Sequence, residues 1–335
     1  MKRVINLSIV AIGVILFSGG CATDTINDSL KGVKIDKAGK TITEASTPYS
    51  SVLPQLNEMI RVFRNKPINV FINPIENKTG NNAKLPADIT AIVIDTFTKI
   101  GNYVVPVADI ANSENAKRDL FVISGAITEY DKVASKDSGV NAVGTGTVGR
   151  GHHRWDSEGS SDSEYTKIIL GISFLPIDSQ TSNYIPLKSV SNRVVIEKKS
   201  NANEFAFSIL GSGFGFNNAV TKSQGIHQSI RALVELSVAE LLGKLGDFPY
   251  WLLVKKGGKV DQNVLNSLVQ QFLREPLNKK IEQVSYLLQL RGKNVKTTRI
   301  MTPELRKAII EFKKEHGLPA NDTLSKEFYI KLLTP

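Results

Sequence analysis

Ile68-Asn69-Val70-Phe71-Ile72 and Tyr103-Val104-Val105-Pro106-Val107 are two short runs rich in β-branched and aromatic residues. Each run predicts a strand, and Asn73-Pro74 ends the first one because proline cannot donate a hydrogen bond to the ladder. A helical pattern lies between them. Residues 68–107 are therefore predicted to form a strand, a helix and a second strand in that order.

The helix between these strands is marked by one apolar stripe. Pro86 opens it, and Gly101 stops it at the position where a left-handed residue caps a helix. Residues at the three-and-four spacing of one buried face run along it: Ile89, Ile92, Val93, Thr96, Phe97 and Ile100.

Further strands and one long helix extend this unit. Strands are predicted over residues 119–130, 165–176 and 184–197, and a helix over 226–245. Its inward residues are predicted to be Ile230, Leu233, Val234, Val238, Leu241 and Leu242. The predicted fold class is α+β, a mixed sheet with packed helices and β-hairpins over residues 51–252, followed by a small all-α domain.

The chain begins like an exported protein. Residues 1–20 have a basic start, an apolar stretch too short to span a bilayer and small residues at the end, which predicts a signal peptide. Cys21, the only cysteine, follows and cannot form a disulfide within the chain. A plain signal peptide that happens to end near a cysteine is the alternative. No second long apolar run follows.

The residues before Cys21 resemble the lipobox of bacterial lipoproteins. The resemblance implies that the Cys21 thiol is diacylated, that cleavage makes it the new N-terminus, and that acyl chains hold the protein in a membrane. Ala22, in place of Asp, implies the periplasmic face of the outer membrane. Residues 21–50 are polar and predict a lipidated tether.

The basic character belongs to the C-terminal part. The net charge is +10, and residues 255–335 carry sixteen Lys or Arg against eight Asp or Glu. Such a surplus suits a solvated face or an anionic partner at the cell surface. Peptidoglycan carboxylates, lipid headgroups and extracellular nucleic acid all fit that charge.

A helical tail follows a basic hinge. Lys255-Lys256-Gly257-Gly258-Lys259 predicts a flexible hinge over residues 253–265, and residues 266–335 show only helical patterns. Thr302 is predicted to cap a helix that has Pro303 at its first position. A last short helix is predicted near residues 325–333.

No catalytic, metal or cofactor site emerges from the sequence, so we expect a protein that is not an enzyme. The glycines of residues 144–149 match a dinucleotide pattern, yet no helical stripe follows them to present amides to a pyrophosphate. His152 and His153 are adjacent and would point to opposite faces of an extended segment.

Residues 205–216 alternate aromatic and small residues, which is typical of a strand or hairpin with one apolar face. That face suits an ordinary sheet, a subunit contact or lipid. Residues 138–165 are more polar, and their carboxylates would be costly in the middle of a bilayer.

The order of these features resembles the curli-secretion lipoprotein (CsgG-like) family. The likeness includes the lipobox and the tether and then covers residues 51–252, with the turn Glu76 to Gly80, the helix and the strand that ends near Pro106. It implies a homo-oligomeric ring at the outer membrane, in which each subunit adds two β-hairpins, near residues 131–165 and 195–222, to a shared barrel.

The same resemblance assigns the pore or ring loop to five residues: Asn81, Asn82, Ala83, Lys84 and Leu85. The family has a long aromatic loop there, so this short loop argues against a narrow gate for an unfolded polypeptide. We expect either a ring that secretes a polypeptide or assembles a surface structure, or a structural ring of a trans-envelope machine such as a flagellar motor or conjugation apparatus. A regulator of wall synthesis is a third hypothesis, and no nucleic-acid partner is expected.

The tail from about Lys280 resembles the small helical peptidoglycan-binding domain of exported proteins. Leu287 to Gly292, Ala308-Ile309, Phe312 and Gly317-Leu318-Pro319 carry that likeness, while the glycines usual before the threonine are missing between Lys293 and Met301. The resemblance and the basic surplus imply a wall contact through Arg299, Thr302, Arg306 and Lys313. A three-helix interaction domain is the alternative.

Overall fold

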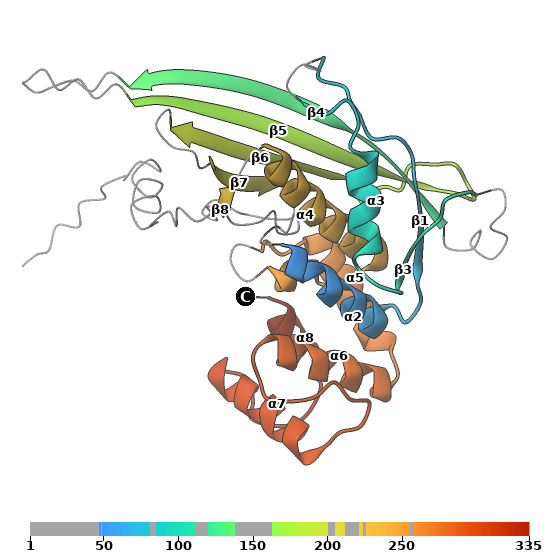
Figure 1. Ribbon diagram of the computed structural model, residues 1–335. Helices are drawn as coiled ribbons and strands as arrows, with labels where there is room; N and C mark the ends of the chain where they lie inside the picture. Colours follow the sequence, from blue (N-terminus) through green and yellow to red (C-terminus); the bar gives the residue numbers. More distant parts are fainter. Residues whose placement is uncertain are drawn as a thin grey trace, which may run out of the picture. The chain divides into compact units, whose positions relative to one another are not determined.

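The predicted strand, helix and strand are present at the start of a mixed sheet (Figure 1). Strands β1 (Ile68–Ile72) and β3 (Val104–Pro106) pair in parallel, and helix α3 (Thr90–Thr98) connects them. The predicted stripe is buried or partly buried. The chain thus has the predicted α+β character.

The computed structural model describes residues 47, 49–80, 85–110, 120–137, 163–199, 205–211, 221–223, 226–254 and 258–334. All of them belong to one compact unit, Thr41–Pro335. None of the helices in this described part is long and apolar enough to cross a lipid bilayer.

Helix α3 begins at Thr90, later than the prediction that Pro86 opens it. The residues just before Thr90 pair with the chain around β2 (Glu76–Asn77) instead. The Ile89 N–H donates to the Ile75 carbonyl at 3.0 Å, and the Asn77 N–H donates to the Ala87 carbonyl at 2.9 Å. The Ala87 carbonyl is therefore occupied by the Asn77 N–H and is not available for a hydrogen bond within a helix that starts at Pro86.

The sheet changes from parallel to antiparallel at β4 (Leu120–Asp137). That strand pairs in parallel with β1 and antiparallel with β5 (Ser163–Asp178). The strand order is β3-β1-β4-β5-β6-β7-β8, with β2 paired to β4. The remaining strands are β6 (Val190–Lys199), β7 (Phe205–Gly211) and β8 (Thr221–Ser223).

The predicted start of the strand over 184–197 was wrong, because β6 begins only at Val190. Tyr184 forms a single bridge with Ile177, and the chain then turns through Leu187, whose φ is +63°. A left-handed residue interrupts an extended strand.

Helix α4 (Ile226–Gly246) covers one face of the sheet and confirms the predicted long helix (Figure 1). All six predicted inward residues are fully buried. The 3₁₀ turn η1 (Ser50–Val52) and helix α2 (Leu53–Phe63) also pack against it. The Glu235 carboxylate of α4 accepts hydrogen bonds from the hydroxyls of Thr47 and Ser50, so the end of the predicted tether belongs to the core.

Part of the opposite face of the sheet is polar. Hydroxyls of Thr128, Ser173 and Ser191 form a row across β4, β5 and β6, with oxygen separations of 3.4 and 3.2 Å. Beside this row, Arg193 forms an ion pair with Glu129 at 2.5 Å. The α4 side of the sheet supplies the fully buried Leu170, Ile172 and Phe174 of β5.

The C-terminal part is helical, as predicted. After the turn η3 (Tyr250–Leu253) come α5 (Gln262–Arg274), α6 (Leu277–Leu290), α7 (Pro303–Glu315) and α8 (Lys326–Leu333). The predicted cap is confirmed, because the Thr302 hydroxyl accepts a hydrogen bond from the Leu305 N–H at 3.2 Å.

This helical tail packs against the sheet domain. The Trp251 indole N–H donates to the buried Leu333 carbonyl at 2.8 Å, and the Tyr250 hydroxyl donates to Asp261 at 3.1 Å. Asp261 also caps α5, so the end of the predicted hinge, from Gln262 onward, is helical. The core residues of the domain and the tail form one continuous cluster.

Gly243 tests how closely α4 packs. A Cβ atom there would lie 2.1 Å from Tyr250 Cδ1, so Gly243→Ala should lower the free energy of unfolding by about 1–3 kcal/mol. Helix propensity alone predicts a gain of about 1 kcal/mol. Gly317→Ala is the control, since its φ of +69° costs about 1 kcal/mol without any steric contact. Urea unfolding followed by circular dichroism measures both, and a more stable Gly243→Ala variant would contradict this packing.

Candidate ligand groove of the helical tail

A groove lies between the loop that follows α6 and the start of α7. Its volume is about 510 Å³. We call it the tail groove, and its lining residues are Asn294, Val295, Lys296, Thr297, Thr298, Thr302, Glu304 and Leu305. Amide, hydroxyl, ammonium and carboxylate groups thus line the groove together with the apolar side chains of Val295 and Leu305.

Hydrogen bonds to α6 hold the loop side of the tail groove. The Thr298 N–H donates to the Ser285 hydroxyl at 3.0 Å, and that hydroxyl lies 3.2 Å from the Thr298 carbonyl. The Thr297 hydroxyl donates to Gln289 Oε1 at 3.1 Å. Gly292, with a φ of +81°, turns the chain from α6 into this loop.

The other side of the tail groove is the start of α7. Hydrogen bonds from its own backbone N–H and from Thr302 lower the pKa of Glu304. The unpaired amides of a helix start favour a carboxylate in the same way. The only basic residue that lines this groove is Lys296.

The four predicted wall-binding residues have different surroundings in the structure. Thr302 lines the tail groove. Arg299 is half exposed and pairs with Glu282 at 3.0 Å, while Arg306 pairs with Asp322. Lys313 is buried. Its ammonium donates to Asn321 and to the Thr323 carbonyl, both at 2.6 Å, and burial lowers its pKa. Only Thr302 therefore reaches the groove, and the other three have partners within the protein.

Other predicted features lie outside the described residues. These are Cys21, residues 81–84 of the loop, the hairpin tips, and the histidine pair at 152–153. Leu85, the end of the loop, is described and is buried in the core.

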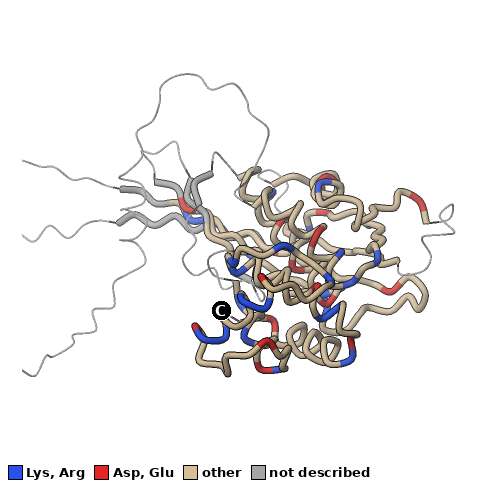
Figure 2. Tube along the Cα trace, turned by 90° about the horizontal axis from the view of Figure 1, so that it is seen from below, with Lys and Arg blue, Asp and Glu red and all other residues tan. Residues whose placement is uncertain are grey.

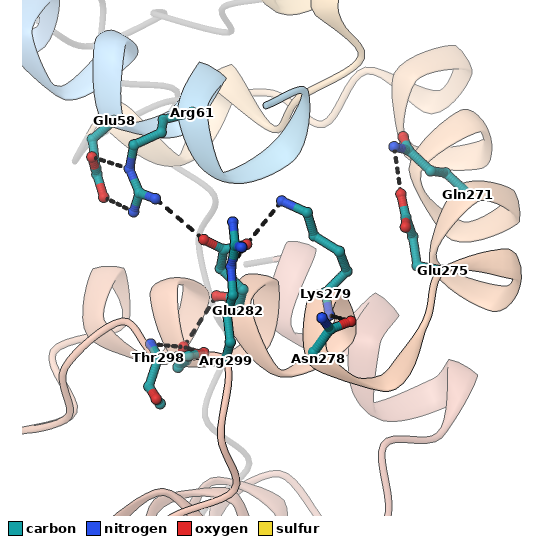
Figure 3. A network of polar contacts seen from close by, with 10 residues as sticks. Glu58, Arg61, Gln271, Glu275, Asn278, Lys279, Glu282, Thr298 and Arg299 are labelled. Carbon is teal, nitrogen blue, oxygen red and sulfur yellow. Dashed lines mark hydrogen bonds and ion pairs between the residues drawn. The ribbon is translucent and has the colours of Figure 1, made fainter. Parts of the chain in front are cut away.

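A network of charged side chains joins α2 to α6 (Figure 3). The almost fully buried Glu282 of α6 pairs with Arg61 of α2 at 3.2 Å, with Lys279 at 2.8 Å and with Arg299 at 3.0 Å. Glu58 pairs with the same Arg61 at 2.5 Å. Burial alone would raise the pKa of Glu282, but hydrogen bonds from Lys279 and Arg299 hold that pKa below its ordinary value.

Some of the Lys and Arg residues that give the tail its positive charge form ion pairs within the protein. Blue and red segments are interspersed along the described trace (Figure 2). Lys293 pairs with Glu315 at 2.5 Å, and Arg291 donates to the Leu332 carbonyl at the end of α8. Lys296 has no such partner among the described residues, which leaves its charge available beside the groove.

Lys296, Thr297 and Glu282 were not among the predicted site residues. Apart from the wall contact of Arg299, the only prediction for the residues between Lys293 and Met301 was that they lack the family's glycines. These residues nevertheless form one wall of the groove. A polar run between two helical stripes is the signal that was available.

A scan against protein-family models gave no match, and the curated proteins gave no match either.

Glu282 should make stability depend on pH. Because its pKa is lowered in the folded state, its contribution is present above the ordinary Glu pKa of about 4.3 and is lost as pH falls through the folded value. Glu282→Gln should therefore cost about 1.5–3 kcal/mol at neutral pH and progressively less in acid. Urea unfolding at a series of pH values measures this.

Glu58→Gln is the matched control for that measurement. Its side chain is 43% exposed and pairs only with Arg61, so we expect a loss below about 1 kcal/mol. An unfolding penalty for Glu282→Gln that stays constant from neutral to acid pH would contradict the role assigned to its charge.

Proposed function

We propose that the chain is a ring-forming lipoprotein of the outer membrane that serves secretion or assembly of a cell-surface structure and is attached to peptidoglycan through its helical tail. The observation that carries the ring is the outer part of the β4–β5 hairpin (Figure 1).

The two strands of this hairpin are unusually long. Strands β4 and β5 have 18 and 16 residues, whereas strands of about 5–6 residues are usual. The pairing continues from Lys132↔Ile168 to Asp137↔Ser163. Ile168 is buried and Lys132 is exposed, and the ladder continues for five residue pairs beyond this pair, up to Asp137↔Ser163.

The outer part of β4 also has an edge without a described partner strand. Strands β1 and β2 pair with β4 only as far as Ile127, and from Glu129 onward the described pairing is to β5 alone. A long strand edge is a template for another chain. If β4 of one copy pairs with a different strand edge of the next copy, and the rotation between copies closes, the result is a ring.

The two attachments follow from the sequence. Cys21 supplies the acyl anchor, and the tail supplies a basic helical module with a polar groove. The resemblance to the curli-secretion lipoproteins supports the same proposal, since that family forms rings, and the mixed sheet with packed helices is compatible with it. A secreted polypeptide or a subunit of an envelope machine would be the partner.

A structural ring without a channel is the second candidate. Gly80 and the buried Leu85 bracket the predicted loop, so only residues 81–84 are left to narrow an opening. If this second candidate holds, the purified ring inserted in a planar bilayer should lack the small, stable conductance of a tight gate. Such a conductance would instead support the secretion pore.

The ring itself is tested by shortening the hairpin. Residues 133–167 would be replaced by a two-residue turn that joins Lys132 to Ile168, which already face each other in the ladder. Negative-stain imaging of the detergent-extracted full chain should show rings. The shortened variant should be monomeric, and its circular dichroism spectrum should keep the helical signal of the unaltered chain.

A second variant is the matched control. Replacing only residues 138–162 by a turn removes the tip and keeps the ladder up to Asp137↔Ser163, so rings should remain. Strictly monomeric particles of the full chain would contradict the proposed ring.

A further inference from the structure

A second groove lies where α2 meets α6, and it reaches the tail groove through a shared wall. Its volume is about 400 Å³. We call it the junction groove, and its lining residues are Gln55, Glu58, Tyr286, Gln289, Leu290, Lys296 and Thr297. Lys296 and Thr297 line both grooves, so a single ligand can contact the sheet domain and the tail together.

Tyr286 is the first sign of a ligand. Its side chain packs edge to face on Phe63 with the ring centroids 6.3 Å apart, and the residue is only 4% exposed although it lines the groove. None of the described residues hydrogen-bonds its hydroxyl. Burial raises the pKa of this phenol, and the Glu58 charge raises it further, so the hydroxyl keeps its proton and can donate.

The charges of the junction groove favour an anion. Its one lining carboxylate, Glu58, is already held by the Arg61 guanidinium through two hydrogen bonds of 2.8 and 2.5 Å. Its one lining cation, Lys296, is exposed and has no ion-pair partner in the described part of the chain. A cation without a counter-ion beside a neutralised carboxylate attracts a carboxylate of the ligand.

The remaining lining groups suit a peptide. Gln289 uses its side-chain oxygen to accept from Thr297, which leaves its NH₂ group for a carbonyl. Gln55 donates to the Ser51 carbonyl at 3.0 Å and keeps its own carbonyl oxygen for an N–H donor. Leu290 and the Tyr286 ring provide apolar contact between these amides.

We propose that the junction groove binds a peptide that carries a free carboxylate, with the Lys296 ammonium and the Tyr286 hydroxyl as its two donors. The source of that peptide, the peptide stem of peptidoglycan, rests on the proposed function. The site itself rests on the groove, and it makes helix α2 of the sheet domain part of the wall contact.

Titration calorimetry with the detergent-extracted full chain tests the site. The probe is a soluble peptidoglycan stem peptide with free carboxylates. The comparison ligand is the same peptide with every carboxylate converted to an amide. Lys296→Gln should weaken binding of the free peptide about tenfold or more, since a hydrogen bond to a charged group is lost. The amidated peptide should bind equally weakly to both proteins.

Two further variants distinguish the loss of a proposed hydrogen-bond donor from the loss of any positive charge on the tail. Tyr286→Phe keeps the ring and removes only a hydroxyl that makes no described contact, so the fold should persist while affinity falls by about threefold to tenfold. Lys307→Gln is the control, because Lys307 is 79% exposed on α7 and lines neither groove. It should bind like the unaltered chain.

Co-sedimentation with insoluble cell-wall sacculi separates this site from the wall attachment. If the unaltered chain binds sacculi but Lys296→Gln leaves both sacculus and peptide binding unchanged, the junction site is wrong and wall attachment stands. If sacculi are not bound but the free peptide binds in a Lys296-dependent way, the site stands and wall attachment is wrong. Binding to neither probe overturns both.

Discussion

Burial of helix α4 is the constraint on which the rest of the structure depends. Nearly every residue from Ser229 onward is buried, including the charged Glu240 and Lys244. These two pair at 2.8 Å, and Glu240 also accepts from the Asn192 side chain of β6 at 2.9 Å, while Lys244 donates to the Ser189 carbonyl. A buried charge is tolerated only when it is paired and hydrogen-bonded. The same contacts therefore fix how α4 lies on the sheet.

Contacts of different kinds hold the tail to this framework, and two of them are specific polar contacts. The Trp251 indole N–H donates to the Leu333 carbonyl at the end of α8, and Glu282 pairs with Arg61, Lys279 and Arg299 between α2 and α6. Both contacts join residues that are distant in sequence. The proposed carboxylate site lies beside the second contact, so the geometry that neutralises Glu58 also leaves Lys296 as the unpaired charge of the groove.

The candidate site was only partly predictable. Thr302 was found because a capping threonine before proline has a local signature, and it lines the tail groove. Lys313 was selected for its charge, yet it lies at the stripe position where α7 packs on Phe328 and serves the fold. Lys296 and Tyr286 carry no local pattern. Their importance comes from which partners they lack, and partners are assigned only when α2, α6 and the loop meet.

The sequence by itself determined the α+β class, the α3 and α4 stripes and the helical tail with its cap, because periodicity and capping act over a few residues. Tertiary structure decided where α3 begins, where β6 begins, and that the tail shares one core with the sheet domain. Those outcomes depend on backbone pairing between Ile75 and Ile89, on a left-handed turn at Leu187 and on side chains that meet across more than eighty residues. Such contacts exist only in the folded chain, so the junction groove is a product of tertiary structure.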